Sequence, residues 1–303
     1  MAATRATGGV IAASLLVLPL AGCSSGGPSE PSDVVNSLAA QASSSGSAPS
    51  AGELPHPAHV VVVVEENHSY ADVIGSSDAP FLNTLAGRGA LFTASYAVAH
   101  PSEPNYLALF SGSTQGLTGD SCPHTFTGSN LGSELLAGGL GFTGYSESMP
   151  STGYTGCGSG DYARKHNPWS NFPALPADTN RTWADFPHDY TALPTVSFVI
   201  PNLAHDMHNG TVRAGDDWLR AHLSDYATWA PTHDSLLVVT WDEDDNGADN
   251  HIPTIITGAG VKPGRYPELL DHYRALRTLT TMYGLSPVGE AAKRTPITDI
   301  WQR

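Results

Sequence analysis

The sequence predicts an α/β domain whose central sheet is mostly parallel, and three apolar runs carry that prediction. Residues 59–64 and 235–241 are rich in Val and Leu and show no alternation of polar and apolar side chains, and residues 195–200 form a third clear strand. A strand that is buried on both faces requires such a run, as in parallel sheets covered by helices. Helical segments separate the strands, which is the order typical of α/β proteins.

Shorter elements complete the expected domain. Further strands are predicted at residues 90–98, 141–146 and 252–257. Helices are predicted at residues 80–86, 216–230 and 271–283. In the second helix, Trp218, Leu219, Leu223 and Tyr226 recur at helical spacing, so we assign them to the core. The Gly/Ser/Thr-rich residues 111–140 and the irregular residues 153–187 are expected to be loops around a site.

The first 55 residues are expected to serve export. Arg5 precedes an apolar run from Val10 to Leu20, as in a signal peptide of residues 1–22, and the run is too short for a permanent membrane span. Leu20-Ala21-Gly22-Cys23 resembles the bacterial lipobox, whose Cys is lipidated after cleavage. Residues 23–55 then form a flexible Ser/Gly/Pro linker to a catalytic domain at 56–303. We expect an extracytoplasmic protein that is anchored through Cys23 or secreted.

Charge and cysteine content indicate which partners the protein binds and whether it contains a disulfide. The chain has 14 basic and 29 acidic residues, a net charge of -15, and its longest basic cluster is Arg164-Lys165. The sequence therefore predicts no binding of nucleic acid. Separately, we expect a monomer. Cys122 and Cys157 form an even pair in an oxidising compartment, for which a disulfide is the default expectation.

Polar clusters follow each of the three apolar strands. They are Glu65-Glu66-Asn67, then Asn202 with Asp206 and His208, then Asp242-Glu243. Because parallel strands end at one edge of a sheet, these side chains should meet there. Carboxylate, amide and imidazole groups together favour a hard divalent metal ion. Taken singly, each His is more often structural, and Glu65 or Glu66 could simply be solvated.

A serine lies between a predicted strand and a short apolar segment. Ser102 precedes Glu103 and Pro104, so it is the natural N-cap of a helix whose first turn holds Pro104. Backbone N–H groups of such a turn suit a phosphate. A Ser in this position is usually only a cap, and its assignment as a nucleophile depends on the acidic clusters.

Five segments together resemble the bacterial phosphoesterase family of acid phosphatases and phospholipases C. They are residues 63–70, 100–112, 162–168, 200–208 and 240–243, in the order of the family's motifs. The resemblance extends over about residues 60–257 and implies an alkaline-phosphatase-like three-layer sandwich. The Ser-x-Pro-Asn turn at 102–105 is similar to the Thr-x-Pro-Asn nucleophile turn of nucleotide pyrophosphatases in that superfamily.

The resemblance also implies roles for individual residues, with Ser102 as the nucleophile. The implied metal ligands are Glu66, Asn67, Asp206, His208, Asp242, Glu243 and His251. The implied substrate contacts are Asn105, Lys165, His166, Asn202 and His205. Asn202 replaces the usual metal-binding Asp of the superfamily and Glu243 replaces a His, so the ion could be Mg, Mn, Ca or Zn, in a number left open.

The resulting hypothesis is metal-dependent hydrolysis of phosphate monoesters through a phosphoserine. Metal ions would supply the positive charge that the few Lys and Arg residues do not. A phospholipase C-like phosphodiesterase or a phosphoinositide phosphatase, acting on phospholipid, is the nearest alternative. A non-catalytic surface lipoprotein that binds metal or phosphate is the alternative from another class.

Overall fold

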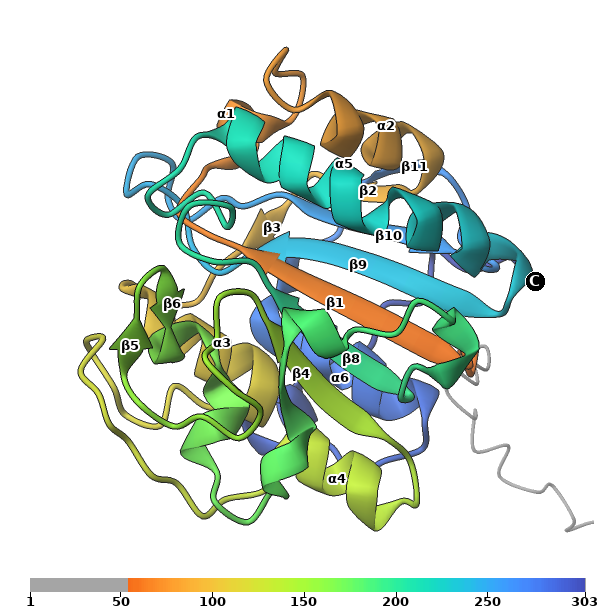
Figure 1. Cartoon of the computed structure of the whole chain (residues 1–303). Coiled ribbons are helices and arrows are strands. Elements are labelled where there is room, and N and C mark those ends of the chain that lie inside the picture. The colour runs from red at the N-terminus through yellow and green to blue at the C-terminus, as the bar shows by residue number, and fades with distance from the viewer. Residues whose placement is uncertain (1–53, 303) are drawn as a thin grey trace, which may run out of the picture. The chain divides into compact units, whose positions relative to one another are not determined.

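The three apolar runs form the centre of one twisted sheet, as Figure 1 shows. The computed structural model describes residues 54–302. Strand β1, His59–Glu65, lies between β8, Val196–Ile200, and β9, Ser235–Trp241, and is parallel to both. The five valines of β1 are fully buried because the sheet is covered on both faces. The predicted signal peptide, Cys23 and nearly all of the linker lie outside the described residues.

Five further strands extend this sheet to eight, in the order β11-β2-β10-β9-β1-β8-β4-β7. They are β2 (Ala90–Phe92), β4 (Phe142–Ser146), β7 (Asn180–Thr182), β10 (Thr254–Gly258) and β11 (Gly264–Tyr266). Only β10 runs antiparallel to its neighbours in this sheet, so the prediction of a mostly parallel sheet is confirmed. Two small ribbons pair β3 (Ser95–Tyr96) with β12 (Leu270–Asp271), and β5 (Gly158–Ser159) with β6 (Tyr162–Ala163).

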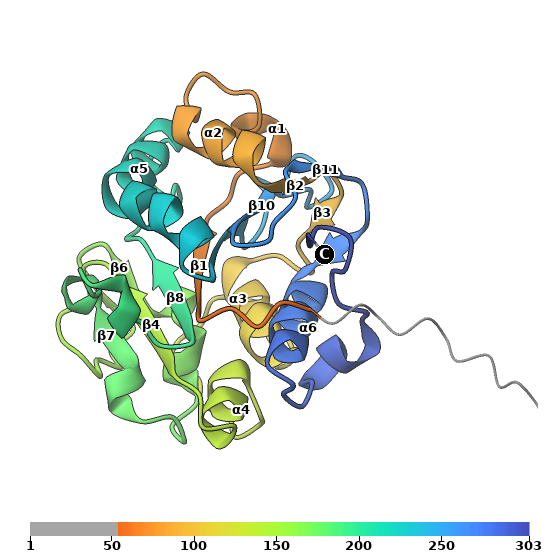
Figure 2. The same cartoon turned by 90° about the vertical axis from the view of Figure 1, so that its right-hand side faces the viewer.

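Helices cover both faces of the large sheet and so form the outer layers (Figure 2). One face carries α3 (Ser102–Ser111), α4 (Leu131–Ala137) and α6 (His272–Met282), and the other carries α2 (Pro80–Arg88) and α5 (Val212–Trp229). A short helix, α1 (Tyr70–Val73), follows β1. Side chains alternate across β1, so Val60, Val62 and Val64 pack in the first core while Val61 and Val63 pack in the second.

The structure corrects several predicted boundaries. The stretch 90–98 contains two short strands in different sheets, β2 and β3, and the stretch 111–140 contains helix α4. Asn130 caps α4 by accepting a hydrogen bond from Ser133 N at 2.9 Å. The helix was not predicted because this capping pattern is short and lies in a Gly-rich stretch. Helix α5 begins at Val212, because Thr211 caps it, and not at Asp216. Across residues 54–302, no helix has both the length and the apolar character needed to cross a membrane.

Candidate active site

The carboxyl ends of the three central strands bring four acidic residues together, as predicted. Glu66 follows β1, Asp206 lies in the loop after β8, and Asp242 and Glu243 follow β9. Backbone hydrogen bonds fix two of the connections, because Glu66 N donates to Asp206 O at 2.7 Å and Asp242 N donates to Glu65 O at 2.9 Å. All four acidic side chains are buried.

Ser102 points its hydroxyl into this acidic group. Its Oγ lies 3.1 Å from Glu66 Oε2 and 3.1 Å from Glu243 Oε1, so it can donate to either carboxylate. The prediction that Ser102 is the N-cap of the helix is wrong, since Pro101 holds the capping position and Ser102 is the first residue of α3. The hydroxyl contacts the two acids instead of the helix backbone and is free of a capping role.

Asn105 holds the turn that precedes Ser102. Its Oδ1 accepts hydrogen bonds from Val98 N at 3.1 Å and Ala99 N at 3.0 Å, and its Nδ2 donates to Ala99 O at 2.8 Å and to Pro101 O at 3.4 Å. The amide is buried, and both of its polar atoms form hydrogen bonds with backbone groups. This geometry favours a positioning role over the predicted contact with a phosphoryl oxygen.

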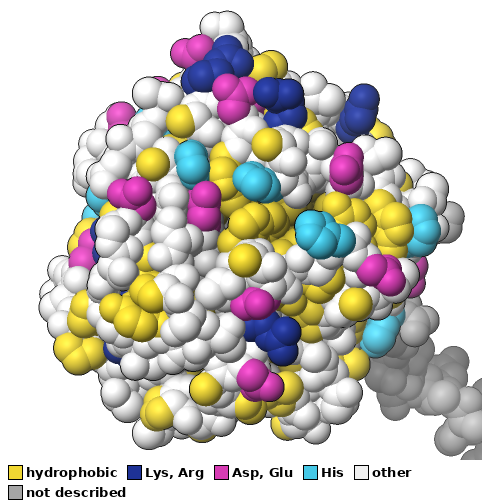
Figure 3. Space-filling model, viewed as in Figure 1, with side chains coloured by type: hydrophobic (Ala, Val, Ile, Leu, Met, Phe, Trp, Pro, Cys, Tyr) yellow, Lys and Arg dark blue, Asp and Glu magenta, His cyan; other side chains and the backbone are white. Residues whose placement is uncertain are grey.

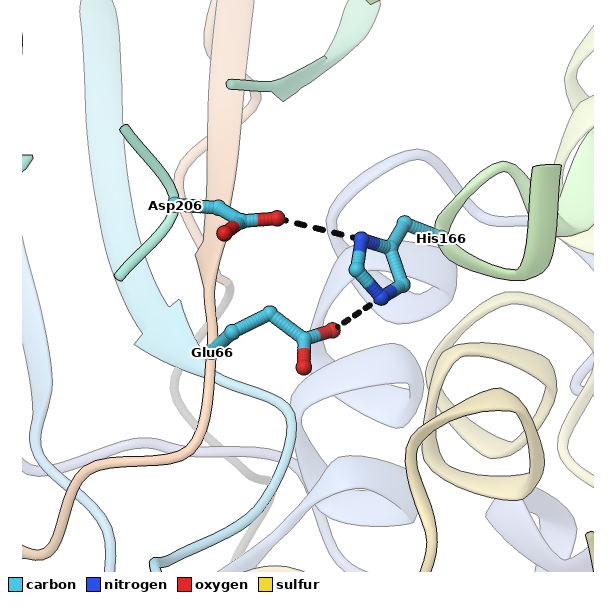
Figure 4. Close-up of side chains that lie close together, drawn as sticks. All are labelled: Glu66, His166 and Asp206. Atoms are coloured by element: carbon cyan, nitrogen blue, oxygen red, sulfur yellow. Dashed lines mark ion pairs between the residues drawn. The ribbon is translucent and has the colours of Figure 1, made fainter. Parts of the chain in front are cut away.

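His166 lies between two of the acidic side chains (Figure 4). Its Nε2 is 2.8 Å from Glu66 Oε1, and its Nδ1 is 3.1 Å from Asp206 Oδ2. The ring belongs to the 3-10 helix η1, Arg164–His166, which follows the ribbon of β5 and β6. The sequence placed His166 among the substrate contacts, whereas here it joins the predicted metal ligands.

Glu243 contacts two further polar side chains besides Ser102. Its Oε1 also accepts a hydrogen bond from Asn67 Nδ2 at 3.1 Å, and its Oε2 lies 2.5 Å from His100 Nδ1. The second ring nitrogen of His100 is 3.2 Å from Asp244 Oδ1. Asn67 adopts a left-handed backbone with φ of 48°, which Asn tolerates, and this turns the chain after β1. His100 had no predicted role, although it begins the motif that contains Ser102.

The charges in the group are strongly coupled. Burial favours the neutral acid at Glu66, but the charge of His166 outweighs it and lowers the Glu66 pKa to about 2. Burial likewise opposes a charge on His166, but the Glu66 carboxylate raises the His166 pKa to about 9. Burial, followed by the charges of Glu66 and Glu243, raises the pKa of Asp242 well above its usual range. The acids therefore repel one another, except where a positively charged group such as His166 lies between them.

The same side chains form two groups that could hold a cation, and Glu66 belongs to both. One group is Glu66, His166 and Asp206, and the other is Glu66, Asp242 and Glu243, with ligand atoms within 4.8 Å of one another in each. Glu66 Oε1 and Asp206 Oδ2 each face one nitrogen of the His166 ring, whereas Asp242 Oδ2 is buried without a hydrogen-bond partner among the described residues. Because unpaired buried carboxylates are costly and are preferred ligands of divalent ions, the residues fit a metal ion.

Two predicted substrate contacts, Asn202 and His205, gather around a different acid. Glu147 accepts a hydrogen bond from Asn202 N at 2.9 Å, and its carboxylate lies 2.9 Å from His205 Nδ1. Asn202 Oδ1 accepts from Ala204 N at 3.0 Å, so the amide closes the turn after β8. In the described chain this pair stands apart from the acids that contact Ser102.

His251, a predicted metal ligand, also lies outside both groups of acids. Its Nε2 is 3.1 Å from Thr93 O, and its ring stacks between Tyr70 and Tyr96 with centroids at 4.7 and 5.0 Å. The histidine follows directly on the loop after β9, but the stacking holds it against β3. Its predicted role as a ligand remains a prediction.

Two residues near the site could not be identified from the sequence, and a third was assigned differently. Tyr106 stacks on the His166 ring at 5.0 Å between centroids, and no role was predicted for it. Asp120 lies 2.9 Å from Lys165 Nζ, and no pattern in its loop pointed to it. His208, predicted as a metal ligand, is exposed and lies 3.3 Å from the same Lys165 Nζ.

Comparisons with known proteins place this geometry in a family. The model of the Phosphoesterase family matches residues 76–286, which is more than two thirds of the chain. The chain belongs to this family. Phosphatidylinositol-3-phosphatase of Mycobacterium tuberculosis is 54% identical over 254 residues, which are 83% of this chain and 85% of the relative. Acid phosphatase of Aspergillus fumigatus is 27% identical over 245 residues, 74% of this chain and 54% of the relative.

These relatives confirm the predicted class, a phosphoric ester hydrolase. The chain spans about half the length of the fungal acid phosphatases that it matches. Solved structures establish the fold. A protein of the alkaline phosphatase superfamily from Vibrio parahaemolyticus aligns over 80% of this chain and 72% of its own with a TM-score of 0.57 at 16% identity. A lipoteichoic acid synthase from Listeria monocytogenes aligns over 82% and 78% with a TM-score of 0.60 at 12% identity.

Proposed function

We propose that the chain hydrolyses phosphate monoesters with Ser102 as nucleophile and a divalent metal ion as cofactor. One observation carries this proposal. The hydroxyl of Ser102, at the first turn of α3, lies 3.1 Å from carboxylates that follow two different strands, Glu66 and Glu243. A sequestering protein would need the acids but not a buried hydroxyl aimed at them.

The reaction follows from this placement. Ser102 Oγ would form a bond to phosphorus while the ester bond breaks, and the Ser102 proton would pass through Glu243 to the oxygen of the leaving alcohol. A water molecule would then attack the phosphoserine, release inorganic phosphate and restore the hydroxyl. The backbone N–H of Ser102, at the start of α3, would favour a phosphoryl oxygen, while that of Glu103 donates to Asp120.

The metal would be held by Glu66, Asp242 and Glu243, by Glu66, His166 and Asp206, or by both groups. Bound there, a divalent ion supplies positive charge that lowers the pKa of the Ser102 hydroxyl and offsets the charge of the phosphoryl oxygens. Oxygen-rich ligands with one imidazole are compatible with Mg, Mn, Ca or Zn.

The relative from M. tuberculosis suggests the substrate. Its name describes a phosphatase of phosphatidylinositol 3-phosphate, a lipid that carries a phosphate monoester on its inositol ring, and the match covers most of both chains. We therefore propose a phosphorylated inositol lipid as substrate. Attachment through Cys23, if the lipobox is used, would place the enzyme at a membrane surface outside the cytoplasm.

A comparison of three substrates tests the proposal. Initial rates would be measured with p-nitrophenyl phosphate, with bis-p-nitrophenyl phosphate and with phosphatidylinositol 3-phosphate in mixed vesicles. We expect hydrolysis of both monoesters, little of the diester, and loss of all activity after exhaustive EDTA treatment with recovery on adding a divalent ion. Preference for the diester would favour a phosphodiesterase, and activity that survives chelation would remove the metal from the account.

A labelling experiment tests the proposed location. Cells expressing the full chain would be grown with a radioactive fatty acid, and the membrane fraction would be compared with that of a Cys23→Ser variant. We expect label and membrane association only with Cys23. Equal membrane association of the variant, without label, would contradict the lipid anchor.

A further inference from the structure

Lys165 is a cation at the edge of the acidic group. Its side chain is 18% exposed, so the ammonium remains accessible to a ligand. Its Nζ also lies 3.3 Å from Nε2 of the exposed His208. The next residue, His166, contacts Glu66 at 2.8 Å, so the Lys165 cation lies beside the acids that surround Ser102.

Asp120 joins this cation to the helix that carries Ser102. One oxygen, Oδ2, lies 2.9 Å from Lys165 Nζ, and the other, Oδ1, accepts a hydrogen bond from Glu103 N at 2.9 Å. Glu103 is the second residue of α3, whose first N–H groups have no partner within the helix. A single carboxylate therefore ties the position of Lys165 to the first turn of the nucleophile helix.

The two loops that meet here are fastened independently of Asp120. A disulfide joins Cys122 to Cys157, with 5.8 Å between the Cα atoms. Arg164, next to Lys165, donates to Thr155 O at 2.6 Å and to His124 O at 3.1 Å. Partly exposed ion pairs contribute little to stability, so the loops should stay folded when the Asp120 charge is removed.

We propose that Asp120 is a positioning residue that holds the Lys165 ammonium where it binds the phosphate group of the substrate. The inference rests on the proposed function and adds a residue to it. Lys165 touches phosphate, and Asp120 acts only through Lys165 and through the first turn of α3.

Asp120→Asn is the variant that tests this role, because the amide oxygen can still accept from Glu103 N while the charge opposite Lys165 is lost. Inorganic phosphate binding would be measured by calorimetry, together with KM and kcat for p-nitrophenyl phosphate. We expect the Kd of phosphate and the KM to rise about tenfold, with kcat within about twofold of the parent. Asp120→Glu should recover part of the loss.

The opposite result has a clear physical meaning. If Asp120 merely competes with phosphate for the ammonium, removing its charge lowers the Kd, and a lowered or unchanged Kd overturns the proposal. In a Lys165→Met background, Asp120→Asn should no longer raise the Kd. An equal rise in both backgrounds would show that Asp120 acts without Lys165 and would also overturn it.

A matched control comes from an exposed pair on α5. Asp217 Oδ1 lies 3.1 Å from Arg220 and Asp217→Asn is the same chemical change away from the site. It should alter neither phosphate binding nor thermal unfolding. The titration also separates the two proposals. A parent protein that binds phosphate but hydrolyses no ester refutes the proposed function, while the effect of Asp120→Asn on binding still tests Asp120.

Discussion

Ser102 Oγ lies 3.1 Å from Glu66 Oε2, although the two residues are 36 positions apart in the chain. The contact joins the first residue of helix α3 to the residue that follows strand β1. The other oxygen of Glu66 faces His166 at 2.8 Å, so this one side chain links the candidate nucleophile to both groups of possible metal ligands. Replacing Glu66 should therefore reduce activity more than replacing any other acid of the site.

Replacing Glu66 by Gln should reduce kcat/KM by at least about a hundredfold, because the charge shared by the two ligand groups is lost. Bound metal, measured by mass spectrometry after dialysis, should fall in parallel.

The adjacent Glu65 provides the control. It is also buried, and burial, followed by the charge of Asp206, raises its pKa well above the usual range, which favours the neutral carboxyl. Glu65→Gln keeps that neutral shape and should change kcat/KM by less than about threefold. Equal losses in the two variants would show that the site does not depend on Glu66 in particular.

Asn105→Ala should act on the turn before Ser102. The substitution leaves partly buried backbone groups of Val98, Ala99 and Pro101 without partners, so we expect stability to fall by roughly 2 kcal/mol and kcat to fall with it. KM should change by less than about threefold. Urea unfolding and steady-state kinetics would measure both effects. Normal stability with a tenfold rise in KM would instead support direct contact with phosphate.

Glu103 makes stability depend on pH. Burial raises its pKa from 4.5 to about 7, so the folded state holds the proton more tightly than the unfolded chain. Its contribution is most favourable below pH 4.5 and declines as pH rises through about 7. Glu103→Gln, which can still accept from Asn171 Nδ2, should therefore gain about 2 kcal/mol relative to the parent between pH 5 and pH 8. A pH-independent difference in urea unfolding would contradict this.

The disulfide should contribute mainly to stability. It closes a loop of 35 residues, for which chain entropy predicts a loss of roughly 3–4 kcal/mol when both Cys122 and Cys157 are changed to Ser. Thermal unfolding of the parent with and without reductant should show a similar difference, and the double variant should not respond to reductant. A parent that loses the bond, as judged by mass, but keeps its unfolding temperature would refute the estimate.

Much of the fold could be predicted because its signals are local. The valines of β1 show no alternation, which requires burial on both faces, and parallel strands necessarily end at one edge. The same reasoning predicts that Glu66, Asp206, Asp242 and Glu243 meet at that edge, as they do. No comparable local pattern predicts the path of a loop.

The loops explain what could not be predicted. His166, predicted as a substrate contact, meets the acids because the segment after β6 brings it to the strand ends, whereas His208, a predicted metal ligand, is exposed beside Lys165. His251 follows the loop after β9 but is held by stacking on Tyr70. Asp120 lies next to Lys165 because the disulfide and the hydrogen bonds of Arg164 hold their two loops together.

The most direct test of the central claim is to trap the covalent intermediate. The protein would be mixed with excess p-nitrophenyl phosphate, quenched in acid within milliseconds and digested, and phosphopeptides would be sequenced by mass spectrometry. We expect one added phosphate on Ser102, absent from a Ser102→Ala variant that retains its fold and metal. Rapid turnover with no phosphate on Ser102, or an active Ser102→Ala variant, would contradict it.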